Sequence, residues 1–315
     1  MKKLIEYLIN NFDKVKIHSN YIDKGDVFIA LAGKNNHGNN FIQVAIRKGA
    51  KYIITDQKPD LNSQNKKIII LKNFLKFLQE ISIKKRKLYN GKVIGITGSI
   101  GKTSIKENLK FFLTPYFVIS ASIKSYNNYL GVIISLINLN LKSDFAIFEI
   151  GTNNFNEIKR LTSLVKPSQI IISNIFQTHL ENLKNTRNVA IEKSDIFNPK
   201  YNSHAELLII TNDNIDEKFI INKAKKYNIN NIIVIGKSLN SDIKILSLKN
   251  KKDLTINVKI KNKNEIINFY IDKNQIHRIN NVLCCLAIFI YNKININYFT
   301  SMTNKIPEIE CRGKI

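Results

Sequence analysis

The sequence predicts an α/β protein, with a small N-terminal α/β domain followed by a larger domain built on a doubly wound, mostly parallel sheet. Short apolar runs rich in Ile and Val alternate with helical patterns from residue 92 onward, which is typical of such sheets. A glycine-punctuated turn joins the first of these runs to a helical pattern. The 315 residues suffice for two domains with separate hydrophobic cores.

The N-terminal domain is expected over residues 1–87. The apolar stretch that follows the initial Met-Lys-Lys is interrupted by Glu6 and Asn10. It therefore predicts a helix and not a signal peptide. Beyond it, alternating apolar residues and a helical spacing predict two strands and one helix. These are expected at 26–31, 51–55 and 41–48, the last being the helix.

The domain boundary is predicted at the charged run 84–87, which we interpret together with Asn90–Gly91 as a solvated linker. The second domain is expected over 91–306. It ends with an added hairpin-like region at 242–271 and a helix at 277–290. Its other strands are expected at 92–97, 116–120, 145–150, 169–175, 206–211 and 231–235.

Composition narrows the function class. The net charge is +25, but the lysines are scattered among Asn and Ile, and no Arg-rich arm or aromatic stacking pattern accompanies them, so we expect no specific nucleic-acid partner. The three cysteines form no disulfide framework, which suits a reducing compartment. The apolar stretch 282–291 is too short to span a bilayer. We therefore expect a cytoplasmic protein without a membrane partner.

The segment 93–104 reads Val-Ile-Gly-Ile-Thr-Gly-Ser-Ile-Gly-Lys-Thr-Ser and predicts a P-loop-type phosphate cradle. Glycines let backbone N–H groups converge on an anion, Lys102 adds a charge, and the Thr103 hydroxyl is placed to bind Mg²⁺. The strict pattern has a glycine where Ile96 stands, and the alternative is an ordinary glycine-rich turn. The candidate nucleotide-binding residues are Gly98, Ser99, Gly101, Lys102, Thr103 and Ser104.

Three more candidates lie near predicted strand ends, where such sheets bind ligands. Glu149 interrupts the apolar run 145–150, and a metal ion or water would offset the cost of burying it. The alternative is a side chain that reaches the strand edge. His179 follows another strand and is either a metal ligand or a structural histidine. Lys193, by itself, reads as a lysine on a solvated helix face.

Several motifs agree in order and spacing with those of the Mur ligases, and the resemblance covers essentially the whole chain. The forms Glu-Ile-Gly and His-Leu-Glu resemble those of the member that joins D-alanyl-D-alanine to UDP-N-acetylmuramoyl-tripeptide. The segments that carry the resemblance are 25–33 (G-D-x-F-x-A-L-x-G), 101–107 (G-K-T-x-x-K-E), 126–132 (N-N-x-x-G-V), 148–158, 174–181, 193–197 and 277–283.

The resemblance implies an ATP-dependent amide ligase of peptidoglycan precursor synthesis that works through an acyl phosphate. Its implied small-molecule substrates are UDP-N-acetylmuramoyl-tripeptide and D-alanyl-D-alanine. Its implied cofactors are ATP, two Mg²⁺ ions and a lysine carbamate formed from CO₂. By resemblance, Lys102, Glu149, His179 and Lys193 are catalytic, and the metal ligands are Thr103, Glu149, His179 and carbamylated Lys193. Asn174, His277 and Asn281 would serve the nucleotide, and Ser19, Asn127 and Asn128 the sugar-peptide substrate.

The chain also departs from the family pattern. Asn20 stands where an arginine is expected after Ser19, and Arg278 replaces the asparagine that follows the adenine-side histidine. The family has a third, C-terminal domain, and 307–315 is expected to be the beginning of the linker to it. The chain is then a fragment, a partner of a separately encoded domain, or the product of a decaying gene.

Two alternative functions remain at this stage. A remnant without turnover would still bind ATP or the UDP-sugar peptide. A basic P-loop protein acting on nucleic acid is suggested by the net charge alone.

Overall fold

The computed structural model describes residues 1–33, 36–60, 66–123, 125–177, 180–212, 216–250 and 255–308. The chain divides into two compact units. The first comprises Met1–Asn90 together with Ile133–Lys142, and the second comprises Gly91–Val132 together with Ser143–Ile315. The apolar segment 133–142 could be expected from its composition to lie in a core, but composition does not say in which of the two.

The first unit contains a parallel sheet in which the described strands follow the order β1-β2-β3-β4. The expected strands and helices at 26–31, 41–48, 51–55 and the N-terminus are confirmed. Two short strands were not predicted, because two or three residues are too few for a periodic pattern. The bounds are α1 (Lys2–Asn10), β1 (Val15–Lys16), β2 (Val27–Ala30), α2 (Ile42–Arg47), β3 (Tyr52–Thr55), β4 (Ile68–Ile70) and α3 (Phe74–Leu88).

The interpretation of 84–87 as a solvated linker is wrong, because α3 continues to Leu88. Lys85 is fully buried and donates hydrogen bonds to the carbonyl oxygens of Leu8 (3.1 Å), Ile137 (2.6 Å) and Asn11. These oxygens lie at the C-terminal ends of α1 and of α5 (Tyr129–Ile137), where the helix dipole favours a cation. Burial lowers the pKa of Lys85 to about 8. A run of charged residues therefore indicates a solvated segment only if none of its side chains can bond buried hydrogen-bond acceptors.

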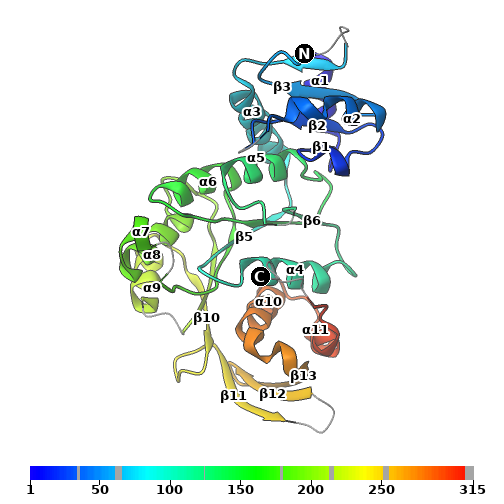
Figure 1. Ribbon diagram of the computed structural model, residues 1–315. Coiled ribbons are helices and arrows are strands. Elements are labelled where there is room, and N and C mark those ends of the chain that lie inside the picture. Colours follow the sequence, from blue (N-terminus) through cyan, green and yellow to red (C-terminus); the bar gives the residue numbers. More distant parts are fainter. Residues whose placement is uncertain are drawn as a thin grey trace. The chain divides into compact units, whose positions relative to one another are not determined.

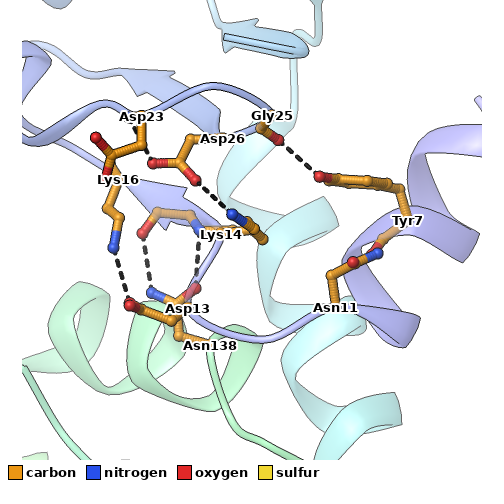
Figure 2. A network of polar contacts seen from close by, with 10 residues as sticks. Tyr7, Asn11, Asp13, Lys14, Lys16, Asp23, Gly25, Asp26 and Asn138 are labelled. Carbon is orange, nitrogen blue, oxygen red and sulfur yellow. Dashed lines mark hydrogen bonds and ion pairs between the residues drawn. The ribbon is translucent and has the colours of Figure 1, made fainter. Parts of the chain in front are cut away.

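Asn138 connects the segment 133–142 to the edge strand β1. Its side chain accepts a hydrogen bond from the Val15 N–H (2.8 Å) and donates one to the Val15 carbonyl (2.9 Å). Figure 2 shows this side chain beside Asp13, whose N–H donates to the Asn138 carbonyl at 3.2 Å. In the same view, the Tyr7 hydroxyl donates to the Gly25 carbonyl at 2.7 Å. The Asn138 side-chain amide therefore bonds the N–H and the carbonyl of Val15 on β1, as the backbone of a neighbouring strand would.

Asn138→Ala is expected to lower the free energy of unfolding by roughly 2–4 kcal/mol, because it leaves a buried N–H and a buried carbonyl of Val15 without these partners. Urea denaturation of both proteins measures the difference. Asn140→Ala is the control on the same segment, because Asn140 accepts an exposed, local hydrogen bond from the Lys142 N–H, and a change below about 1 kcal/mol is expected. Equal losses in the two variants would contradict this role for Asn138.

The second unit contains, in the described residues, a nine-stranded sheet with the order β13-β12-β11-β10-β9-β8-β5-β7-β6. All neighbours from β11 to β6 are parallel, and β11, β12 and β13 are antiparallel. The predicted doubly wound sheet with an added hairpin region is confirmed. The bounds are β5 (Lys92–Thr97), β6 (Ile119–Ala121), β7 (Phe145–Glu149), β8 (Gln169–Ile172), β9 (Leu207–Thr211), β10 (Asn231–Gly236), β11 (Ile243–Asn250), β12 (Thr255–Asn262) and β13 (Glu265–Asp272).

Helices α4 and α10 share a hydrophobic core with one face of this sheet, and Figure 1 shows α6 across β5 from α4. β5 lies between β8 and β7, so the strand order reverses at β5. Ligands of open α/β sheets bind at such a reversal. No helix of the described residues is both long and apolar enough to cross a membrane. The helix bounds are α4 (Lys102–Leu113), α6 (Glu157–Val165), α7 (Leu180–Leu183), α8 (Thr186–Lys193), α9 (Glu217–Lys226), α10 (Ile279–Tyr291) and α11 (Ile296–Met302).

Candidate active site

The turn between β5 and α4 has a backbone that requires glycine at two positions. Gly98 has φ +146° and Gly101 has φ +88°, a region that residues with a Cβ rarely adopt. A Cβ on Gly98 would collide with the Ser173 hydroxyl, and one on Gly101 would lie 2.8 Å from Asn281 Oδ1. The glycine spacing read from the sequence therefore has a steric reason, and it places Asn281 directly beside the loop.

The chain that follows β8 holds this loop in place. Asn174 accepts two hydrogen bonds from the loop, from the Ser99 N–H to its carbonyl (2.9 Å) and from the Ile100 N–H to its Oδ1 (2.8 Å). The Ser173 hydroxyl donates to the Ile100 carbonyl at 2.6 Å. The strand expected at 169–175 ends at Ile172. The Ser173 N–H still donates to the Thr97 carbonyl of β5 (3.0 Å), but the Ser173 hydroxyl and Asn174 bond the loop. Asn174 thus contacts the loop itself in this structure.

The first turn of α4 presents a positive surface. The N–H groups of Lys102, Thr103 and Ser104 lie in the first turn of α4, where helix geometry directs N–H groups away from the carbonyls of the helix. The helix dipole adds a partial positive charge there. The Lys102 ammonium donates to the Gly98 carbonyl at 2.6 Å and to the Ser99 carbonyl at 3.4 Å. This arrangement attracts a phosphate group.

Glu149 ends β7 and is 0% exposed, so the alternative of a side chain reaching the strand edge is wrong. Its Oε2 accepts a hydrogen bond from Thr103 Oγ1 (3.0 Å), and its Oε1 lies 3.1 Å from the Lys106 ammonium. Lys106 is also 0% exposed, and it donates to the Ser122 carbonyl at 2.8 Å. Lys106 was not predicted as a site residue, although it lies one helical turn after Thr103 and hence on the same face of α4.

A divalent cation fits the donor set at Glu149. Among the described residues, Oε1 of Glu149 accepts no hydrogen bond of good geometry despite being fully buried. Carboxylate and hydroxyl oxygens are the ligands that Mg²⁺ prefers. No group of three or more His, Cys, Asp or Glu side chains that could hold a metal occurs in the ranges that the structure describes. His179, expected as a metal ligand, lies outside those ranges.

Lys193 is the last residue of α8 and is 2% exposed, so its interpretation as a solvated surface lysine is wrong. Burial and, to a smaller extent, the charge of Lys102 lower the pKa of Lys193 to about 7, while Glu192 opposes the shift. Glu192 accepts hydrogen bonds from the N–H groups of Ile158 and Asn156, both at 2.8 Å. The carboxylate next to Lys193 therefore caps the N-terminus of α6.

A cavity of about 400 Å³ lies next to Lys102. Asn127 and Asn128 line it, as the resemblance led us to expect for substrate-binding residues. The Asn128 side chain also caps α5 by accepting a hydrogen bond from the Gly131 N–H at 2.9 Å. Three other lining residues were not predicted as site residues: Tyr129, Glu157 and Arg160. Tyr129 and Glu157 lie within the motif segments 126–132 and 148–158, whereas no motif marks Arg160.

The remaining candidates lie in different surroundings. His277 is exposed in a 3₁₀ turn (Lys273–Arg278), where its Nε2 accepts a hydrogen bond from Arg278 Nε at 3.1 Å. Ser19 belongs to the first unit, where it begins the 3₁₀ turn Ser19–Tyr21 and is buried. The structure therefore brings together Lys102, Thr103, Glu149, Asn174 and Asn281 within the second unit.

Comparisons with known proteins agree with this architecture. Residues 96–289 match the Mur ligase middle domain, and residues 11–86 match the Mur ligase family catalytic domain. The UDP-N-acetylmuramoyl-tripeptide–D-alanyl-D-alanine ligase of Rickettsia prowazekii is 38% identical over 239 residues, which are 76% of this chain and 52% of that protein. The Buchnera aphidicola (strain Bp) ligase of the same name is 35% identical over 58% of this chain and 41% of that protein. The chain thus spans about half the length of the curated relatives it matches.

Solved structures are similar in fold. A crystal structure of MurF from Acinetobacter baumannii superposes with a TM-score of 0.78 at 19% identity, covering 98% of this chain and 69% of that one. The MurF ligase of Thermotoga maritima in complex with ADP gives a TM-score of 0.71 at 21% identity, covering 93% and 66%. The middle-domain match extends over more than half of the chain and includes the loop, Glu149 and Lys193. The chain therefore belongs to the Mur ligase family.

Proposed function

We propose that this chain carries the ATP site and the sugar-peptide site of a ligase that joins D-alanyl-D-alanine to UDP-N-acetylmuramoyl-tripeptide. The observation that supports this most is the hydrogen bond from Thr103, directly after the phosphate-type loop, to the buried Glu149, next to a cavity lined by Lys102, Asn127 and Asn128. The names of the relatives support the choice of substrates. Residues 1–87 are the proposed UDP-sugar domain and 91–306 the proposed ATP domain.

The proposed reaction has two steps. An oxygen of the peptide carboxylate attacks the γ-phosphorus of ATP, the bond to the bridging oxygen breaks, and ADP leaves. The amine of D-alanyl-D-alanine then attacks the acyl phosphate and loses a proton, an amide bond forms, and inorganic phosphate leaves. Both steps gather negative charge around phosphorus, so the protein contributes chiefly position and fixed positive charge.

This chain offers that charge at the phosphate loop. In the proposal, the N–H groups at the start of α4 and the Lys102 ammonium bind the phosphates, with Gly98, Ser99, Gly101 and Ser104 as the loop around them. Asn174 keeps the loop in its shape through the hydrogen bonds described above. Asn281, beside Gly101, and His277 face the rest of the nucleotide, and Ser19 contacts the UDP-sugar.

Two Mg²⁺ ions are the proposed metals, one held by Thr103 and Glu149 and a second by His179, with a carbamate on Lys193 as a further ligand. When bound, they would neutralise charge on the phosphates. Only a neutral amine reacts with CO₂, and the low pKa of Lys193 keeps a large share of the amine neutral near pH 7. A carbamate would convert this buried cation into an anionic oxygen ligand, which supports the choice of a lysine at this position.

Mixing the chain with UDP-N-acetylmuramoyl-tripeptide, ATP, Mg²⁺ and D-alanyl-D-alanine tests the proposal. The mixture is assayed with and without a C-terminal domain supplied from a relative, which represents the proposed separately encoded partner. We expect phosphate release that requires all components of the mixture. The proposed cellular location is the cytoplasm, where ATP is present. Calorimetric binding of ATP without turnover in either mixture would favour a binding remnant. Absence of both binding and turnover would contradict the proposed function.

A further inference from the structure

The cavity beside Lys102 carries an excess of positive charge. Its charged lining residues are Lys102, Glu157 and Arg160. Two cations therefore face one carboxylate across a space of about 400 Å³, which is large enough for several non-hydrogen atoms of a ligand. Whether the cavity offers positive charge to a ligand depends on the protonation of Glu157 and on the groups that its carboxylate already bonds.

Glu157 is already engaged by its own loop. Its carboxylate accepts hydrogen bonds from the N–H groups of Asn153 (2.6 Å) and Asn154 (3.1 Å), and from the Asn154 side-chain amide (3.1 Å). Burial alone would raise the pKa of Glu157, but these hydrogen bonds outweigh it and hold the pKa below its usual value. Glu157 is thus an anion whose acceptors are directed at residues 153–154, which precede α6, and not at Arg160.

Arg160 is held in place without an acid. Its guanidinium stacks on the Tyr129 ring at 3.5 Å from the centroid, which fixes the plane of the fork and leaves its N–H edge to other groups. No carboxylate of the described residues lies within ion-pair distance of it. Arg187 provides an internal comparison, because it stacks on Phe219 at the same 3.5 Å but pairs with Asp216 at 2.9 Å.

We propose that Arg160 binds a second carboxylate of the UDP-linked tripeptide, distinct from the one that ATP activates. This inference rests on the proposed function. An arginine fork binds a carboxylate with two parallel hydrogen bonds, and this geometry selects for an acid at that position. The carboxylate that reacts must keep its oxygens nucleophilic, so a fixed cationic fork serves a neighbouring acid better. Arg160 is accordingly a specificity-determining residue.

The second carboxylate has two possible sources in the peptide. It belongs either to the side chain of the third residue, as in diaminopimelate but not in lysine, or to a part of the peptide that both forms share. Four ligands separate these cases: UDP-N-acetylmuramoyl-tripeptide with either third residue, each with a free or an amidated terminal carboxylate. Binding to the full chain is measured by calorimetry, so turnover is not needed.

Arg160→Gln is expected to weaken binding about 10- to 100-fold, and Arg160→Lys nearly as much, because it keeps the charge but loses the fork. Arg187→Gln is the matched control and should bind as the wild type does. Weakening confined to the diaminopimelate forms assigns the side-chain carboxylate, and equal weakening of all four ligands assigns the shared one.

Two results overturn the proposal while leaving the proposed function standing. In the first, Arg160→Gln binds all four ligands as the wild type does. In the second, it weakens only the ligands with a free terminal carboxylate, which would mean that Arg160 holds the reacting group. If the wild-type chain binds none of the four, the proposed function fails, and this inference fails with it.

Discussion

Glu149→Ala is expected to lower the free energy of unfolding by about 3–5 kcal/mol, in addition to abolishing the proposed activity. The pair it breaks is fully buried, with the Lys106 ammonium 3.1 Å from the carboxylate. Removing one partner of a buried pair leaves the other charge without its buried counter-charge, and this is among the larger penalties known for a single substitution. Guanidinium denaturation of both proteins measures the difference.

Two further variants show whether the buried charge is the cause. Lys106 also contacts Glu107 at 3.0 Å, but the Glu107 side chain is 35% exposed, so Glu107→Gln should change stability by less than about 1 kcal/mol. The double variant Glu149→Leu with Lys106→Met removes both charges and should recover most of the loss. A double variant as unstable as Glu149→Ala would contradict the explanation.

The stability difference between the wild type and Lys193→Met is expected to depend strongly on pH. Burial lowers the pKa of Lys193 to about 7 in the folded protein, against an ordinary value of 10.5. Between these values the unfolded chain holds a proton that the folded protein has released, so the stability of the wild type rises with pH. The rise amounts to about 4–5 kcal/mol relative to Lys193→Met, and below pH 7 the full penalty for the buried charge remains.

Thermal or urea unfolding at several pH values in CO₂-free buffer gives this curve. Lys200→Met is the matched control, because Lys200 is exposed, and its stability should run parallel to that of the wild type. If the difference between the wild type and Lys193→Met does not change between pH 6 and pH 10, the ammonium is solvated, and the basis for a carbamate at this position disappears.

The loop and the central strands could be predicted because they depend on local sequence. Glycines at positions 98 and 101 and the apolar run that ends at Glu149 leave a signature that one sequence carries by itself. Lys85, Lys193 and Arg160 could not be placed in this way. A lysine in a charged helix has the same local pattern whether its face meets solvent or the carbonyls of a distant helix end, as for Lys85. The position of the Arg160 guanidinium depends on its stacking on Tyr129, which lies far from it in the sequence.

The observed end of a strand differs from the predicted one where contacts outside the sheet determine the conformation of the last residues. The apolar pattern at 169–175 extends past Ile172, but Ser173 and Asn174 have partners in the loop. The same limit applies to Lys106, whose position on α4 is predictable while its carboxylate partner on β7 is not. Local pattern gives the elements of this chain, and long-range pairing decides which of their polar residues form the site.

Glu192 has a consequence for how the site responds to its ligands. One side chain on α8 closes the start of α6, and the next residue along the chain is Lys193. Glu192 thereby connects α6, which carries Arg160, to α8, which carries Lys193. In the proposed function, a bound peptide that loosened the first turn of α6 would also free the Glu192 carboxylate, whose charge raises the pKa of Lys193. Peptide binding and the protonation of this amine would then be thermodynamically linked.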